Sequence, residues 1–215
     1  MSLKERLLAH VSCEAAARYL IENGLVKVNG HVITDYTIPA DGLDTIEILN
    51  ADPPLRLNAP ESYWRARVMQ ERVGFVSFGD SVLHVEIRDG GFPLLVRDYR
   101  AEPYVITAKQ FLNTKRIEGN PLTLTPGEIQ AVTKARVDAL VLELELDAFK
   151  VFQALERLLP ALKSRGKLVV FLSGLGRDNK SLDEMARRFL PEMFVDVREV
   201  FPFKEGVYVY GKRTN

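Results

Sequence analysis

The chain has 215 residues, of which 47% are hydrophobic and 27% are charged, and its 29 basic residues balance its 29 acidic residues. This length and composition exclude a disordered tail and are sufficient for a buried core in one or two domains. The balanced charge excludes a strongly basic nucleic-acid-binding protein, so any contact with a polyanion must come from a local patch.

The cysteine, histidine and apolar residues exclude several further classes of protein. The single Cys13 excludes a disulfide framework, and the scattered His10, His31 and His84 do not have metal-ligand spacing, so no metal is expected. No apolar run approaches the roughly 18 residues that a membrane span needs, and the charged N-terminus lacks the apolar segment of a signal sequence. We therefore expect a cytoplasmic protein without membrane contact.

The first 50 residues predict a small α+β module. Residues 3–23 have the apolar spacing of two short helices, with Ser12 as the expected N-cap of the second helix. Residues 25–33 predict two strands joined by Asn29-Gly30, the strongest short-range sequence signal for a β-hairpin. A further turn and strand are expected at 41–42 and 45–48.

A polar, proline-containing stretch at residues 51–61 predicts a linker. Beyond it, residues 62–215 alternate short apolar runs with helical patterns, which indicates an α/β fold with a mostly parallel sheet. The clearest helical stripes are at 148–162 and 182–190. Strands are expected at 81–87, 104–108, 137–146, 167–172 and 207–210. The expected domains are therefore 1–50 and 62–215.

Residues 12–48 resemble the RNA-binding domain found in small-subunit ribosomal protein S-four. The similarity is carried by residues 17–30, ARYLIENGLVKVNG, and by the DGLDTI segment at 41–46. It implies that the second helix and the hairpin dock on structured RNA through phosphate contacts, leaving most bases unread. The cations available for these contacts are Lys4, Arg6, Arg18, Lys27 and His31.

The charge of this module limits the expected affinity for RNA. Residues 1–50 contain four Lys/Arg and seven Asp/Glu residues, a net charge of −3. Cys13-Glu14 stands where members of the family usually have Ser-Arg, and Glu22 occupies a commonly basic position. We therefore expect weak RNA binding from the module alone. The alternative is a protein-contact module in which Arg18 and Lys27 are ordinary solvated charges.

Three segments of the larger domain carry a second resemblance. Residues 81–92, 137–170 and 205–211 resemble the first strand and nucleotide loop, the fourth strand to fifth strand, and the terminal hairpin strand of FtsJ-type and TlyA-type ribosomal-RNA methyltransferases. The resemblance implies a Rossmann-like sheet with a terminal antiparallel strand and an S-adenosylmethionine site at Gly90, Gly91 and Phe92. The TlyA-type order also begins with a small S-four-type domain.

The same comparison places atypical residues at the implied methyl-donor site. His84 replaces an acidic residue, and Glu86 stands at a glycine position where a Cβ would take up ligand space. The segment 107–109 has no carboxylate for the ribose hydroxyls. Gly90 and Gly91 are retained, either for a cofactor or for the strand-to-helix turn.

The implied reaction centre is altered as well. FtsJ-type enzymes use a Lys-Asp-Lys-Glu set to position and deprotonate a ribose hydroxyl. The first position falls at residues 65–68, which contain arginine and no lysine, and the others fall at Glu143, Phe171 and Glu205. Glu143 and Glu205 are therefore the candidate catalytic residues. For Glu143, the alternative is a solvated strand end shared with Glu145 and Asp147.

These observations favour an RNA-binding protein, for ribosomal or other structured RNA, whose methyltransferase-like domain has lost S-adenosylmethionine binding and catalysis. No cofactor is then expected. The first alternative is an active S-adenosylmethionine-dependent RNA methyltransferase of the FtsJ or TlyA type. The second alternative is a protein-interaction module. Each of these interpretations is compatible with a protein partner or with a homo-oligomer.

Overall fold

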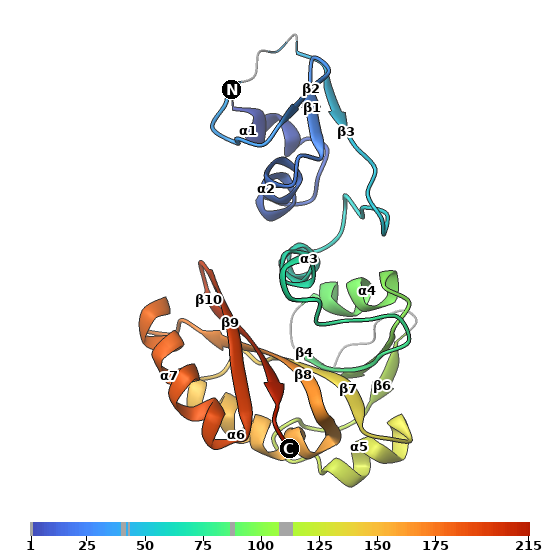
Figure 1. Ribbon diagram of the computed structural model, residues 1–215, viewed down its shortest axis with the longest axis vertical. Helices are drawn as coiled ribbons and strands as arrows, with labels where there is room; N and C mark the ends of the chain where they lie inside the picture. Colours follow the sequence, from blue (N-terminus) through green and yellow to red (C-terminus); the bar gives the residue numbers. More distant parts are fainter. Residues whose placement is uncertain (1, 40–41, 43, 87–88, 108–113) are drawn as a thin grey trace. The chain divides into compact units, whose positions relative to one another are not determined.

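The computed structural model describes residues 2–39, 42, 44–86, 89–107 and 114–215 (Figure 1). The chain divides into two compact units: unit 1 is Met1–Val68 with Asp89–Asp98, and unit 2 is Met69–Arg88 with Tyr99–Asn215. The expected domain boundaries, at 1–50 and 62–215 with a linker between them, stay a prediction.

Unit 1 begins with two short helices and a three-stranded antiparallel sheet of order β2-β1-β3. Asn29 and Gly30 both have positive φ, 51° and 82°, as a two-residue hairpin turn requires. The predicted module of two helices and a hairpin is confirmed. Its elements are α1 (Leu3–Leu7), α2 (Glu14–Glu22), β1 (Val26–Val28), β2 (His31–Ile33) and β3 (Ile46–Ile48).

The start of α2 differs from the prediction. Cys13, and not Ser12, is the N-cap, and it makes no side-chain capping hydrogen bond. The Ser12 hydroxyl donates instead to the carbonyl of Ala59, and the Ser12 amide donates to the carbonyl of Leu57 at 3.0 Å. The predicted N-cap is wrong because Ser12 attaches the start of α2 to the segment that precedes the next helix.

Two further helices, α3 (Glu61–Val73) and α4 (Gly91–Asp98), contribute to unit 1, which contains α3 as far as Val68. The fully buried ring of Trp64 lies 5.3 Å from the ring of Tyr19 and 5.4 Å from that of Tyr63. The buried guanidinium of Arg67 donates to the hydroxyls of Tyr19 and Tyr63 at 2.9 and 3.2 Å. These contacts join α2 and α3 within unit 1.

Unit 2 is built on a seven-stranded sheet of order β6-β5-β4-β7-β8-β10-β9. Neighbouring strands from β6 to β8 are parallel, whereas β10 is antiparallel to both β8 and β9. The predicted mostly parallel sheet with a terminal antiparallel strand is confirmed. The strands are β4 (Ser81–Glu86), β5 (Glu102–Ile106), β6 (Lys115–Ile117), β7 (Val137–Glu143), β8 (Leu162–Ser173), β9 (Val195–Phe203) and β10 (Gly206–Arg213).

The helices of unit 2 include α5 (Pro126–Thr133), α6 (Ala148–Leu158) and α7 (Asn179–Glu192). The apolar stripes of α6 and α7 pack with β7, β8 and β10 in one hydrophobic core, and Figure 1 shows both helices beside the sheet. α7 begins three residues before the expected stripe, because Asp178 caps it by accepting the Ser181 amide at 2.7 Å. No helix in the described ranges is long and apolar enough to cross a membrane.

Candidate active site

The carboxyl ends of β4, β5, β7 and β8 lie along one edge of the unit 2 sheet, which is where open α/β sheets bind ligands. Glu86 at the end of β4 is in register with Glu143 at the end of β7. Glu205 lies in the turn between β9 and β10, and its carbonyl accepts the Gly174 amide at 2.7 Å, directly after β8. Both candidate residues therefore lie toward the same edge.

Glu143 is held in the interior by two side chains from other strands. Its Oε2 lies 3.1 Å from His84 Nε2 on β4, and its Oε1 accepts the hydroxyl of Tyr208 on β10. All three side chains are completely buried. A carboxylate with both oxygens bonded and no access to solvent is suited to holding strands together, and not to accepting a proton from a substrate.

The interpretation of Glu143 as part of a solvated strand end is therefore wrong. Glu145 and Asp147, the other members of that alternation, are exposed as expected. Asp147 caps α6 by accepting the Phe149 amide at 2.9 Å. The sequence signal for burial was present, because Glu143 is flanked by an apolar run on one side and by Leu144 on the other.

Glu205 is the accessible member of the candidate pair. It is exposed at the tip of the β9–β10 hairpin. Phe171, which occupies the second lysine position of the resemblance, is fully buried, and its ring lies 4.8 Å from that of Tyr208. Phe171 therefore supports the Tyr208–Glu143 contact and offers no charge to the edge.

The start of α4, in unit 1, contains a carboxylate that the sequence did not single out. Asp89 Oδ1 accepts the Gly91 amide at 3.1 Å and the Ser62 hydroxyl, and Asp89 Oδ2 lies 3.4 Å from the Ser62 amide. The preceding residues 87 and 88 lie outside the described ranges. An Asp just before a helix is a recognised start signal, which is how Asp89 could have been found.

Gly90 and Gly91 have structural roles at this helix start. Gly90 has a φ of 82°, which favours glycine. A Cβ on Gly91 would lie 2.1 Å from the Tyr63 nitrogen and 2.3 Å from the Ser62 hydroxyl oxygen, so Gly91 allows the close packing of α3 and α4. Phe92 is fully buried. The assignment of these three residues to cofactor binding stays a prediction, and residues 108–109 of the ribose position lie outside the described ranges.

The cations predicted to bind RNA lie on the N-terminal module, and several of them contact acidic side chains. Arg18 is 60% exposed, and such surface pairs contribute little and exchange readily for other anions. His31 is exposed on β2. The RNA-binding assignment stays a prediction. The contacts are Lys4–Glu14 at 2.9 Å, Arg18–Glu22 at 2.6 Å, Lys27–Glu47 at 3.8 Å and Arg6 with the Asp44 carbonyl at 3.0 Å.

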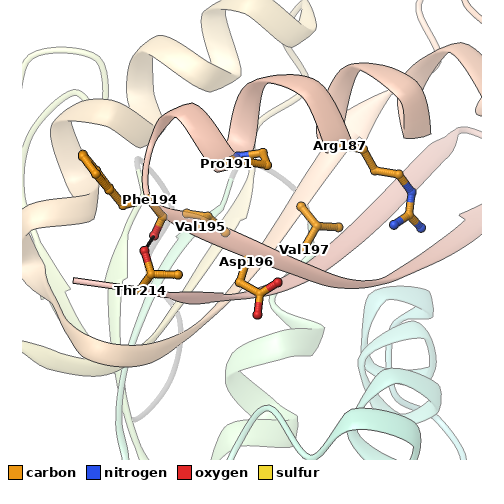
Figure 2. A pocket seen from close by; sticks show the side chains of 7 residues that line it. All are labelled: Arg187, Pro191, Phe194, Val195, Asp196, Val197 and Thr214. Atoms are coloured by element: carbon orange, nitrogen blue, oxygen red, sulfur yellow. Dashed lines mark hydrogen bonds between the residues drawn. The ribbon is translucent and has the colours of Figure 1, made fainter.

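A surface pocket of about 450 Å³ lies at the other end of the sheet (Figure 2). Val195 at the start of β9 pairs with Arg213 at the end of β10, which places the pocket near the amino end of β8. The Thr214 amide donates to the Phe194 carbonyl at 2.8 Å beside it. The pocket therefore lies away from the carboxyl edge. It is lined by Arg187, Pro191, Phe194, Val195, Asp196, Val197 and Thr214.

No family model and no curated protein matches this sequence. Solved structures match it by fold. A structure named as a hemolysin of Streptococcus thermophilus has a TM-score of 0.60 at 12% identity, covering 100% of this chain and 89% of that chain. N-methyltransferase NodS from Bradyrhizobium japonicum, in complex with S-adenosylhomocysteine, has a TM-score of 0.53 at 13% identity, covering 77% and 94%.

A ribosomal protein L11 methylase from Lactobacillus delbrueckii matches with a TM-score of 0.53 at 12% identity, covering 73% of this chain and 81% of that chain. The chain has a Rossmann-like methyltransferase fold. At these identities the similarity shows the fold alone. Whether the chain has a catalytic activity depends on its own site residues.

Proposed function

We propose that this chain is an S-adenosylmethionine-dependent methyltransferase that acts at the carboxyl edge of the unit 2 sheet. The observation that carries the proposal is the strand order, with β10 inserted antiparallel between β8 and β9. The NodS complex with S-adenosylhomocysteine, at a TM-score of 0.53, supports it. Ligands of open α/β sheets bind outside the carboxyl ends of the strands.

The start of α4, in unit 1, has groups of a kind suited to the positively charged groups of a methyl donor. When bound, the donor supplies an electrophilic methyl group on a sulfonium, and its amino-acid end carries an ammonium and a carboxylate. Asp89 offers an exposed negative charge, and Gly90, with a φ of 82°, lets the backbone turn without a side chain. An anionic side chain attracts the sulfonium and the ammonium.

Methyl transfer to a hydroxyl or an amine also requires that the nucleophile be oriented and lose a proton. Glu205 is suited to accept that proton because it is exposed beside the end of β8, where the Gly174 amide bonds its carbonyl at 2.7 Å. Glu143 is assigned to holding the strands because its carboxylate is buried. The S-four-type resemblance makes structured RNA the first substrate to test.

A transfer assay tests the proposal. The full chain is incubated with methyl-tritiated S-adenosylmethionine and either purified ribosomal RNA or a protein extract. We expect label in RNA, a decrease of at least about tenfold for Glu205→Gln, and full activity for Glu192→Gln, a carboxylate on α7 outside the candidate site. Background incorporation into both pools would contradict the proposal.

A second candidate function is RNA docking without catalysis. It is favoured because both carboxylate oxygens of Glu143 are already bonded, to His84 and Tyr208. It predicts binding of a structured RNA hairpin that weakens steeply between 50 and 200 mM salt, by an order of magnitude or more, together with no effect of the methyl donor. Absence of any RNA binding in a gel shift at low salt would remove this candidate and leave the protein-interaction alternative.

A further inference from the structure

An exposed aromatic side chain lies beside the carboxyl edge of the unit 2 sheet. Phe149 follows β7 in the first turn of α6, and it is 50% exposed. The ring of Phe189 meets its ring edge-on, with the centroids 5.8 Å apart, and so fixes its orientation. The guanidinium of Arg177 lies over the Phe149 ring, 6.0 Å from its centroid. An exposed ring with a cation above it is a surface on which a planar aromatic group can stack.

The turn that contains Arg177 is bonded to the hairpin that contains Glu205. The Arg177 amide donates to the Gly174 carbonyl at 3.0 Å, and the Gly174 amide donates to the Glu205 carbonyl at 2.7 Å. Lys204 precedes Glu205 in the turn between β9 and β10. Arg177 and Lys204 are therefore held on two bonded turns, at the edge where the proposed base lies.

These two cations differ from those of the N-terminal module because they lack acidic partners. Arg177 and Lys204 are both exposed, and neither forms an ion pair with any residue that the structure describes. Arg18 and Lys27, in contrast, lie 2.6 and 3.8 Å from glutamate oxygens. A cation without such a partner can neutralise a phosphate without giving up an existing contact. Residues 51–215 also have 25 basic and 22 acidic residues, a net charge of +3.

The aspartates at this edge repel phosphates less than their number indicates. Asp147 and Asp178 cap α6 and α7 by accepting backbone amides at 2.9 and 2.7 Å. The positive ends of the two helix dipoles partly offset their charge. Glu145 and Glu205 are also exposed there, so the affinity of this edge for a polyanion should be sensitive to salt.

We propose that a single-stranded segment of RNA docks at this edge, with one unstacked base on Phe149 and neighbouring phosphates on Arg177 and Lys204. The inference rests on the proposed function for RNA as the substrate, and it adds the contacts that hold the strand. An exposed ring accepts the face of any base, and unpaired cations complement phosphates. A duplex keeps its base faces stacked inside, so it can use the cations but not Phe149.

Fluorescence anisotropy of the full chain measures this docking without the methyl donor. The probes are a labelled oligouridylate of about ten nucleotides and the same strand paired with oligoadenylate. We expect the single strand to bind more tightly than the duplex. Phe149→Ala should weaken its binding at least about fivefold, through the loss of one stacked base. Phe194→Ala, which removes a ring that is 58% exposed at the other end of the sheet, should leave the binding unchanged.

The salt dependence of binding tests the two cations. For a single strand, each lost phosphate contact lowers the slope of log affinity against log salt by about 0.7. Arg177→Gln with Lys204→Gln should therefore lower the slope by about 1.4. Arg18→Gln with Lys27→Gln, on the rival surface, removes the same charge and should lower the slope by clearly less.

The outcomes separate this inference from the proposed function. Equal binding by Phe149→Ala and Phe194→Ala, or a slope that falls only with the Arg18 and Lys27 pair, would overturn the inference, whereas the transfer assay could still show methylation of RNA. Binding of polyglutamate as tight as that of the oligouridylate would indicate an acidic protein partner and would also overturn it. If no RNA binds at low salt, the inference falls, and the proposed function stands only where the transfer assay labels protein.

Discussion

Tyr208 on β10 donates its hydroxyl to the buried carboxylate of Glu143 on β7, although β8 lies between the two strands. His84 on β4 lies 3.1 Å from the other carboxylate oxygen. Among the described strands, β10 forms its backbone ladders with β8 and β9, and not with β7 or β4. One buried carboxylate thus links three strands through side chains.

Removing the Tyr208 hydroxyl should destabilise unit 2. Tyr208→Phe keeps the ring packed against that of Phe171 but leaves one oxygen of Glu143 buried without its donor. Such a loss costs about 1–3 kcal/mol. Urea unfolding followed by circular dichroism measures it, with Tyr36→Phe, an exposed tyrosine, as the control that should remain within about 0.5 kcal/mol of wild type. Equal stability of the two variants would refute the link.

Adding a methyl group at Gly91 should disturb the packing of α3 against α4. The new Cβ would lie 2.1 Å from the backbone nitrogen of Tyr63, which cannot move independently of its helix. Overpacking of this kind costs about 1–3 kcal/mol. Gly127→Ala is the matched control, because its Cβ would meet only the Thr125 hydroxyl at 4.0 Å. Thermal melts that place both variants at the same midpoint would show that Gly91 is not needed for packing.

The stability of the protein at alkaline pH should depend on the raised pKa of Tyr63. Burial raises the pKa of its hydroxyl from 10.0 to about 12. Because the folded pKa lies above the unfolded one, the stabilisation is complete below pH 10 and is lost as the pH rises from 10 to 12. The loss is at most about 2.7 kcal/mol.

The comparison variant is Tyr63→Phe, in which this part of the pH dependence should be missing while that of other tyrosines remains. The measurement is the free energy of unfolding in urea at pH 9, 10 and 11. Parallel pH profiles for the two proteins would show that Tyr63 titrates normally.

Removing the acidic partners of Arg18 and Lys27 should strengthen RNA binding if the N-terminal module docks RNA. Glu22 pairs with Arg18, and Glu47 lies 3.8 Å from Lys27. The double variant Glu22→Gln with Glu47→Gln should raise affinity for an RNA hairpin severalfold at 50 mM salt, and the gain should shrink at 200 mM. Glu184→Gln with Glu192→Gln, on α7, removes the same net charge elsewhere. An equal gain from both pairs would indicate a general charge effect.

Local chemistry explains which elements could be predicted from the sequence. The hairpin was predicted because Asn29 and Gly30 tolerate the positive φ that a two-residue hairpin turn requires, and the α6 stripe because its apolar residues recur at helical spacing. β9 was missed because it is an edge strand whose residues are mostly half-buried, so its pattern is weak. α3 was missed because it begins inside the polar stretch assigned to the linker.

Within each unit, the contacts of the candidate residues depend on residues far apart in the sequence. Ser62 and Asp89 are 27 positions apart, and Glu143 and Tyr208 are 65 positions apart. No periodicity or turn signal encodes such pairs. The family resemblance correctly indicated the methyltransferase-type sheet, but whether a side chain is buried or exposed at its edge required the structure.

Calorimetric titration of S-adenosylhomocysteine into the full chain tests the central claim, a methyl-donor site on this fold, most directly. We expect saturable binding at one site with micromolar affinity, which corresponds to a binding free energy of about −8 kcal/mol. No heat of binding at millimolar ligand would contradict it, and the chain would then be a methyltransferase fold that works without the donor.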